Sequence, residues 1–278
     1  MQSAEPPRET LAVNRSTDAH DYQQLPRPVA AMAKNFPDGH LIERHHHPRA
    51  QLVYAVAGIM TVDTDAGTWL VPPDRALWIP GGVAHQISVS GELQMRTLYV
   101  RADASAHLPR ECRVLAVSPL LRALVVRATE MPAMYDEAGP EGAVMGLILA
   151  EISSLPSVPF HLPMPGDRRL LKLCRLVRDD LASDATRDSY GARVGISSRS
   201  VTRLFQQETG MGFAQWRQKA RLLAALRRLG SGETVTSVAL SLGYASPSAF
   251  TAMFRRILGT TPRSCVTTSQ RGAIVREE

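Results

Sequence analysis

Three histidines in the first third of the chain have a spacing that could hold a metal ion or a small ligand. His45 and His47 stand one residue apart in "ERHHHP", and Gln51 follows four residues later. Alternate residues of an extended strand share a face, so these three side chains would point one way and His46 the other. His85, in "PGGVAH", would add a third imidazole from a neighbouring strand. Such a set can surround a divalent metal ion.

Three interpretations of these side chains remain open. The set His45, His47 and His85 binds a divalent metal, or the same residues line a pocket and hydrogen-bond an organic effector without metal. Alternatively they are surface or satisfied core residues. The neutral Gln51 argues against the metal, because a carboxylate is the better ligand. The sequence holds no Ser–His–Asp or paired-carboxylate arrangement that would suggest another kind of enzyme.

A second group of polar side chains lies in a repeat near the C-terminus. The segments "GISSRSVTRLFQQETG" (195–210) and "GYASPSAFTAMFRRILGTTP" (243–262) share one template at an offset of 49 residues. From Ser197 or Ser246, apolar residues follow at four and eight positions, and a glycine at thirteen. A repeat of this length is typical of one supersecondary unit used twice.

Each copy predicts a helix-turn-helix. A short helix would end at Gly195 or Gly243, and a serine would cap the second helix. The second helix of such a motif lies in the DNA major groove, held by an apolar inner stripe. Its outer stripe supplies the candidate DNA-contacting residues: Ser198, Arg199, Thr202, Arg203 and Gln206 in the first copy, and Ser248, Thr251, Ala252 and Arg255 in the second.

The two copies are expected to read DNA differently. Arginine can pair with guanine through two hydrogen bonds, and each such pair contributes about 1–3 kcal/mol of discrimination. The small residues of the second copy predict closer approach and less sequence information, with Arg255 on phosphate. Between the copies, "GFAQWRQKARLLAALRRLGSG" predicts one long helix that spaces the two reading helices about one DNA turn, roughly 34 Å, apart.

The charge distribution supports a polyanion partner for the C-terminal part only. Residues 168–278 hold 19 Lys+Arg and 8 Asp+Glu, whereas residues 1–167 hold 13 and 18. No apolar run approaches the roughly 18 residues of a membrane helix, so we expect no membrane partner. The three cysteines form no CxxC pair, which fits the reducing cytoplasm, or the nucleoid when DNA is bound.

The elements ahead of the repeat suggest a separate domain. Short β-branched and aromatic runs across residues 40–100 predict strands of a sandwich or barrel, and residues 118–131 and 139–155 predict two helices. The segment "PSVPFHLPMPG", with four prolines, predicts a linker. The expected units are a disordered arm (1–25), an effector-sensing and dimerisation domain (26–155), the linker (156–167), a DNA-binding domain (168–266) and a tail (267–278).

The repeat and its connecting helix resemble the DNA-binding domain of AraC-family bacterial transcription factors. The resemblance covers roughly residues 168–265 and implies two tandem helix-turn-helix units on adjacent major grooves of double-stranded promoter DNA. The sequence departs from the family at Gly191 and Cys265, where the family usually has an alanine and an aromatic residue. The first departure predicts a helix weaker by up to about 1 kcal/mol.

The histidine region resembles the cupin β-barrel over roughly residues 35–100. Gly39, His45, His47 and Gly58 follow the first cupin motif, with Gln51 in place of its glutamate. Pro80, Gly82 and His85 follow the second, while Asp74 and Val89 replace its glycine and asparagine. The resulting fold class is multidomain α+β, with an N-terminal cupin-like β-barrel followed by an all-α tandem double helix-turn-helix domain.

The preferred hypothesis is a non-enzymatic, sequence-specific transcriptional regulator that responds to a small-molecule effector in the barrel. It requires no cofactor, although a divalent metal at the three histidines stays an option. A homodimer through residues 118–155 is a candidate assembly, and RNA polymerase a partner of an activator. The alternative is a metal-dependent cupin enzyme, a dioxygenase or isomerase, with an accessory nucleic-acid-binding domain. A nonspecific DNA-coating protein is disfavoured by the differentiated outer stripes.

Overall fold

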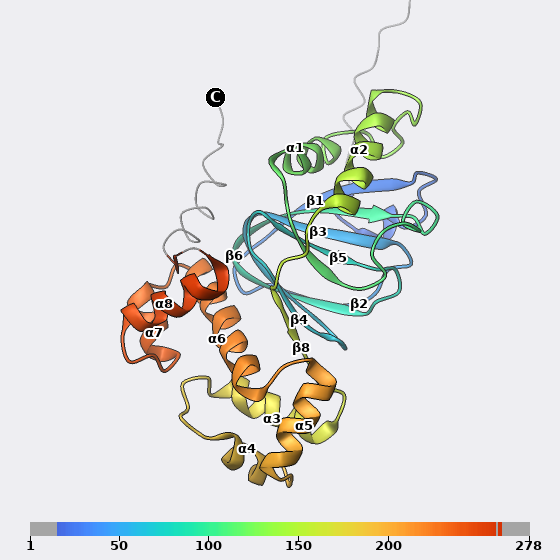
Figure 1. Cartoon of the computed structure of the whole chain (residues 1–278). Coiled ribbons are helices and arrows are strands. Elements are labelled where there is room, and N and C mark those ends of the chain that lie inside the picture. The colour runs from blue at the N-terminus through green and yellow to red at the C-terminus, as the bar shows by residue number, and fades with distance from the viewer. Residues whose placement is uncertain (1–15, 260, 263–278) are drawn as a thin grey trace, which may run out of the picture.

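The computed structural model describes residues 16–259 and 261–262, which form a β-sheet domain followed by a helical domain. Figure 1 shows the helical domain at one side of the sheet and two further helices, α1 and α2, at the other. Residues 1–15, the tail 267–278 and Cys265 lie outside the described residues. Within the described part, no helix combines the length and the apolar character needed to span a bilayer.

The sheet domain is one antiparallel sheet of eight strands built around two long strands. β3 (Ala50–Thr64) and β6 (His85–Val100) pair along almost their whole length. β6 also pairs with β1 and β2, and β3 with β4 and β5, so the sheet folds around its own apolar core. The remaining strands are β1 (Val29–Phe36), β2 (Leu41–His45), β4 (Gly67–Val71), β5 (Arg75–Ile79), β7 (Arg113–Ala116) and β8 (His161–Pro163).

The predicted cupin-like domain is confirmed, but its strands are longer than the sequence runs suggested. "QLVYAVAG" and "IMTVDT" belong to one strand, β3, because Gly58 lies in an irregular stretch between Ala55 and Ile59 that bends the strand without ending it. β6 likewise joins two predicted strands across Gly91. A glycine with positive φ can therefore mark a bulge within a strand as well as a turn between two.

Helices α1 (Pro119–Ala128) and α2 (Pro140–Ser154) match the two predicted helices and pack on the outer face of the sheet. Ser118 caps α1 by accepting a hydrogen bond from the amide of Leu121. Leu121, Val125 and Ile148 pack in the same cluster as Trp78. Trp69 and Trp78 are both buried.

Two segments expected to be unstructured carry regular structure. Within the arm, Ala19–Tyr22 form a 3-10 helix (η1), and Tyr22 is buried against the barrel core. Within the proline-rich linker, β8 extends the sheet by pairing with β4. The prolines are compatible with a three-residue edge strand because an edge leaves one row of amides unpaired. The linker therefore holds the end of the barrel in place.

The helical domain reproduces the predicted duplicated unit. Ser197 and Ser246 accept hydrogen bonds from the amides three residues later, and Gly210 and Gly259 end the second helices in left-handed conformation. The helices are α3 (Arg168–Asp179), α4 (Arg187–Arg193), α5 (Ser198–Thr209), α6 (Phe213–Gly230), α7 (Val235–Ser241) and α8 (Pro247–Leu258). In Figure 1, α4 and α5 lie at one end of α6, and α7 and α8 at the other.

Gly191 departs from the family pattern, and its lack of a side chain allows close packing. A Cβ atom at this position would lie 2.7 Å from the carbonyl oxygen of Ile196 and 3.2 Å from Val201 Cγ2. The missing side chain lets α4 approach the turn and α5 more closely than an alanine would. The loss of helix propensity is thus offset by a tighter helix pair.

Several arginines of α6 bind acceptors within the protein. Arg217 donates to the carbonyl of Ala185 at 3.0 Å, and Arg221 to the carbonyl of Leu181 at 2.6 Å. Arg228 is paired with Glu233. Three of the α6 arginines therefore fix neighbouring loops.

The barrel core and the helical core are continuous. One cluster of buried side chains runs from the sheet into α3, α5, α6 and α8. Gly230, the last residue of α6, leaves room for Ile59 of β3, because a Cβ atom there would lie 2.0 Å from Ile59 Cδ1. The indole of Trp216 donates to the carbonyl of Pro163 at 2.7 Å. The two domains therefore pack as one body.

Acid pH is expected to weaken this junction through His161 of β8. The ring stacks on Trp69 with centroids 4.4 Å apart, and its Nε2 is buried without a hydrogen-bond partner among the described residues. Burial lowers the pKa of His161 to about 4, and the charge of Lys219 adds to the lowering. Between pH 6.5 and 4 the unfolded chain binds a proton that the folded chain excludes. The free energy of unfolding should fall by up to about 1.4 kcal/mol per pH unit as pH decreases.

Urea unfolding at pH 7, 5.5 and 4.5 measures this slope. In His161→Gln the free energy of unfolding should depend less steeply on pH than in the wild type. This difference in slope is independent of any loss of stability at pH 7. His107→Gln, at an exposed histidine, should leave the slope unchanged. Equal slopes for the wild type and His161→Gln would contradict the lowered pKa of His161 as the source of the pH dependence.

Candidate functional site

The outer face of α5 carries the first set of candidate reading residues. Arg199, Thr202, Arg203 and Gln206 are exposed, and Ser198 is half-buried. The opposite stripe, Val201 and Phe205, is fully buried in the helical core. Phe205 packs edge-to-face on Trp216 of α6, with ring centroids 5.8 Å apart. The outer side chains are thus presented on a helix whose inner face is anchored.

Arg187 joins this face, although sequence reasoning missed it. The guanidinium donates from Nε to Ser198 Oγ at 2.7 Å and from a terminal nitrogen to Thr202 Oγ1 at 2.8 Å. Arg187 begins α4 and is separated from α5 by the turn, so no periodicity linked it to the reading stripe. It adds a cation to the face and orients two hydroxyls that α5 offers to a ligand.

The outer face of α8 is less charged. Ser248, Ala252 and Arg255 are exposed and Thr251 is half-buried, while Phe250 and Phe254 are fully buried. Val235 stands in α7 where Arg187 stands in α4, so this position supplies no guanidinium to the second face. The two faces therefore differ in charge and in size of side chain.

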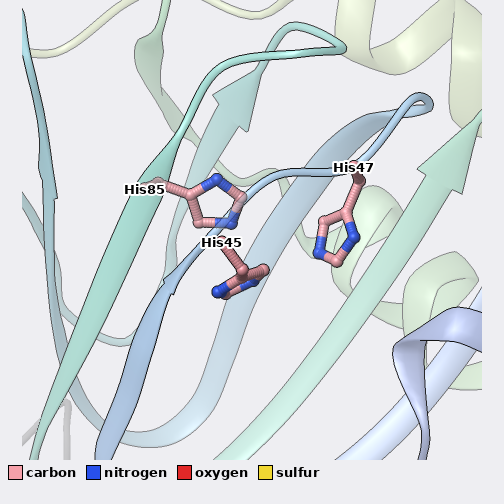
Figure 2. A group of neighbouring side chains, drawn as sticks. All are labelled: His45, His47 and His85. Atoms are coloured by element: carbon pink, nitrogen blue, oxygen red, sulfur yellow. The ribbon is translucent and has the colours of Figure 1, made fainter.

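The barrel brings His45, His47 and His85 together, as their spacing predicted. Figure 2 shows the three rings gathered around one space, and one nitrogen of each lies within 4.8 Å of the others. His45 ends β2 and His85 opens β6, where the two residues pair across the sheet. His46 is exposed, as expected.

His45 and His85 form hydrogen bonds through Nδ1, which leaves the Nε2 atom of each ring free to accept a hydrogen bond or to coordinate a metal ion. His85 Nδ1 lies 2.9 Å from the carbonyl oxygen of Val83, and His45 Nδ1 lies 2.6 Å from that of Glu43. A carbonyl only accepts, so Nδ1 carries the proton in each ring. The Nε2 atoms of His47 and His85 are buried without a partner among the described residues.

Burial, and then the neighbouring imidazoles, lower the pKa of His47 to about 4. Burial is also the main cause that lowers the pKa of His85 to about 4. Both rings are therefore neutral at pH 7, the state in which imidazole binds metal ions.

His45 and His47 line a pocket of about 400 Å³ inside the barrel. Its wall combines apolar side chains, such as Phe36, with polar ones, such as Lys34 and Asp18, the residue that caps η1. Gln51 lines it too, but its amide nitrogen donates to Thr97 Oγ1 at 3.0 Å. The glutamine therefore belongs to the pocket wall, with its carbonyl oxygen still unpaired.

Asp74 explains one departure from the cupin pattern. It is the non-glycine residue with positive φ among the described residues, at 63°, where the motif has a glycine. Aspartate tolerates this conformation better than most side chains. Its carboxylate pairs with Arg122 of α1 at 3.2 Å, which ties the turn to the outer helix.

Comparison with known proteins identifies both domains. A family model described as an AraC-like ligand binding domain matches residues 33–138, and one described as a helix-turn-helix domain matches residues 190–267. The HTH-type transcriptional regulator NimR of Escherichia coli (strain K12) is 31% identical over 218 residues, which cover 78% of this chain and 80% of NimR. The chain belongs to the AraC family.

Two further proteins are similar to this AraC-family chain. The arabinose operon regulatory protein of Escherichia coli (strain K12) is 23% identical over 230 residues, covering 82% of this chain and 68% of that protein. Among solved structures, ToxT from Vibrio cholerae aligns with a TM-score of 0.38 at 10% identity, over 87% of this chain and 99% of ToxT.

The AraC-family chain is a transcriptional regulator with an N-terminal ligand-binding domain and a C-terminal helix-turn-helix domain that binds DNA. Its relatives are named as regulators, so the preferred hypothesis holds over the cupin-enzyme alternative.

Proposed function

We propose that this regulator holds promoter DNA with α5 and α8 together, in two successive major grooves. The observation that carries the proposal is the duplicated helix pair, in which each second helix has a fully buried inner stripe and an exposed polar outer stripe. Arg199 and Arg203 supply most of the base readout, and Arg187 orients the hydroxyls of Ser198 and Thr202. α8 contributes shape and phosphate contacts through its small residues and Arg255.

Selection of binding sequences from a random duplex library with the full chain tests this proposal. The enriched sites should contain two conserved blocks about one helical turn apart, the α5 block being the more restrictive and richer in guanine. Footprinting at promoters next to the gene should then protect both blocks. Enrichment of a single short block, or no enrichment, would contradict the two-helix arrangement.

The barrel pocket is proposed as the effector site. Its volume of about 400 Å³ suits a small organic molecule. The polar groups of its wall would fix the orientation of that molecule, and they include Asp18, Lys34, His45, His47 and Gln51. The η1 residues at the pocket offer a route by which occupancy changes the arm. An effector that binds one arrangement of the regulator more tightly shifts promoter occupancy by that difference in affinity.

The assembly is proposed to be a homodimer through α1 and α2, within a sensing domain at 26–155. Leu120 of α1 and Leu147 of α2 are large apolar side chains that remain 47% and 43% exposed. The regulator acts in the cytoplasm, at the nucleoid when bound to DNA. RNA polymerase is the further partner if it activates transcription.

A divalent metal at His45, His47 and His85 is a second proposal for the same pocket. Two observations favour it: the Nε2 atoms of His47 and His85 are buried without partners, and carbonyls hold Nδ1 of His45 and His85. Metal-binding histidines commonly donate their other nitrogen to such an acceptor. The ion would polarise a coordinated oxygen of the effector and so contribute to its recognition.

Titration of the chelator-treated full chain with Zn²⁺ measures this site. One ion per chain is expected, and His45→Ala should weaken the affinity at least about 100-fold, because one of three ligands is lost. His46→Ala, at the adjacent exposed histidine, should bind Zn²⁺ like the wild type. Equal binding by the wild type and His45→Ala would contradict the metal site.

A further inference from the structure

A second cleft lies outside the barrel, between the sheet and the helical domain. It has a volume of about 290 Å³ and shares no lining residue with the histidine pocket. Thr61 and Ile59 share a face of β3, because alternate residues of a strand point the same way, and Ile59 meets the end of α6. The cleft is thus closed by both domains.

Its rim is strongly basic. Arg175 and Arg178 come from α3 and Arg227 from α6, and Asp179 is the one acidic residue in the lining. Among the described residues, none of these three guanidiniums forms a hydrogen bond or an ion pair. Arg217, Arg221 and Arg228 of α6, in contrast, all bind acceptors within the protein. The rim therefore offers guanidinium donors that the protein itself does not use.

Its floor is apolar with one unused polar group. Leu70, Leu162 and Leu223 are buried side chains in the lining. Thr61 is 7% exposed, and its hydroxyl has no hydrogen-bond partner among the described residues. A buried hydroxyl without a partner is costly, so the floor is suited to a ligand with an acceptor atom at that depth.

We propose that this cleft binds a small organic carboxylate, with the carboxylate on the arginines and an apolar body on the leucines. Guanidinium and carboxylate form paired, charge-assisted hydrogen bonds. A ligand held by residues of both domains binds only when they are docked as observed. It therefore stabilises the docked arrangement and gives the regulator a second, interdomain control point.

Thermal unfolding of the full chain with benzoate, hexanoate and 4-phenylbutyrate at 10 mM, each against its amide at equal ionic strength, tests the proposal. At least one carboxylate should raise Tm by about 3–6 °C and its amide by less than 1 °C. For that carboxylate, calorimetric titration should give a Kd at least about tenfold weaker for the Arg178→Gln/Arg227→Gln double variant, and several-fold weaker for Thr61→Val.

Two variants keep this test specific. Arg168→Gln removes an exposed charge from α3 outside the cleft, and His47→Gln alters the barrel pocket, so both should retain the carboxylate affinity. Loss of affinity in His47→Gln but not in the double arginine variant would overturn the proposal. No carboxylate-specific rise in Tm for any of the three pairs would also overturn it. None of these readouts depends on DNA binding or on the metal, so the proposed function can fail independently.

Discussion

Replacing both Arg199 and Arg203 by alanine is expected to weaken binding to the selected operator at least about 30-fold. Both side chains are exposed on α5, one helical turn apart, and the buried Val201 and Phe205 fix the helix that presents them. A well-formed arginine–guanine pair contributes about 1–3 kcal/mol, so the loss of two pairs exceeds any general electrostatic effect. Gel-shift titration at one fixed salt concentration measures the change.

The matched control removes two positive charges from a different surface of the same domain. Arg168 and Lys172 are exposed on α3, and the Arg168→Ala/Lys172→Ala variant should stay within about fivefold of wild-type affinity. The α5 double variant should also lose its preference for the selected site over random duplex. If its affinity falls no further than that of the control, α5 is not the main reading helix.

Trp216→Ala is expected to lower the free energy of unfolding by about 3–5 kcal/mol, the range observed when large buried aromatic side chains are truncated. Trp216 is fully buried and packs against Phe205 of the reading helix. Its indole also donates to the carbonyl of Pro163, the last residue of β8. The substitution therefore loosens α5 and the junction with the barrel together, and operator affinity should fall as well.

Urea unfolding of the full chain separates the two contributions of this side chain. Trp216→Phe keeps most of the packing and loses the hydrogen bond to Pro163, so it should cost about 1–2 kcal/mol. A loss below about 1 kcal/mol in Trp216→Ala would show that the junction is not supported by this residue.

The reading helices could be placed from the sequence because their signals are local. Ser197, Ser246, Gly210 and Gly259 cap their own helices, and caps act within a few residues of chain. The spacing of His45 and His47 could be interpreted for a similar reason, since strand geometry relates residues two apart. Adding His85 to this set required only that its strand lie next to the strand of His45. The pairing of β2 with β6 meets that condition.

Other features depended on contacts between distant segments and gave no local signal. Arg187 reaches the reading face across a turn, and Arg217 and Arg221 hold the loop at residues 181–185. β8 is a strand only because the edge of β4 is available to it. Long basic side chains near a surface have many acceptors within reach, so their partners follow from the fold and not from their neighbours in sequence.

The sequence by itself determined the family, the two helix-turn-helix units and the histidine set, because helix caps, strand alternation and repeat spacing are short-range properties of the chain. Only the tertiary structure decided that the linker is a strand, that the cores of the two domains merge at Ile59 and Gly230, and that a basic cleft lies between the domains. Those features arise where surfaces far apart in sequence exclude water from each other. The packing of the whole chain sets which surfaces meet, and no local pattern encodes it.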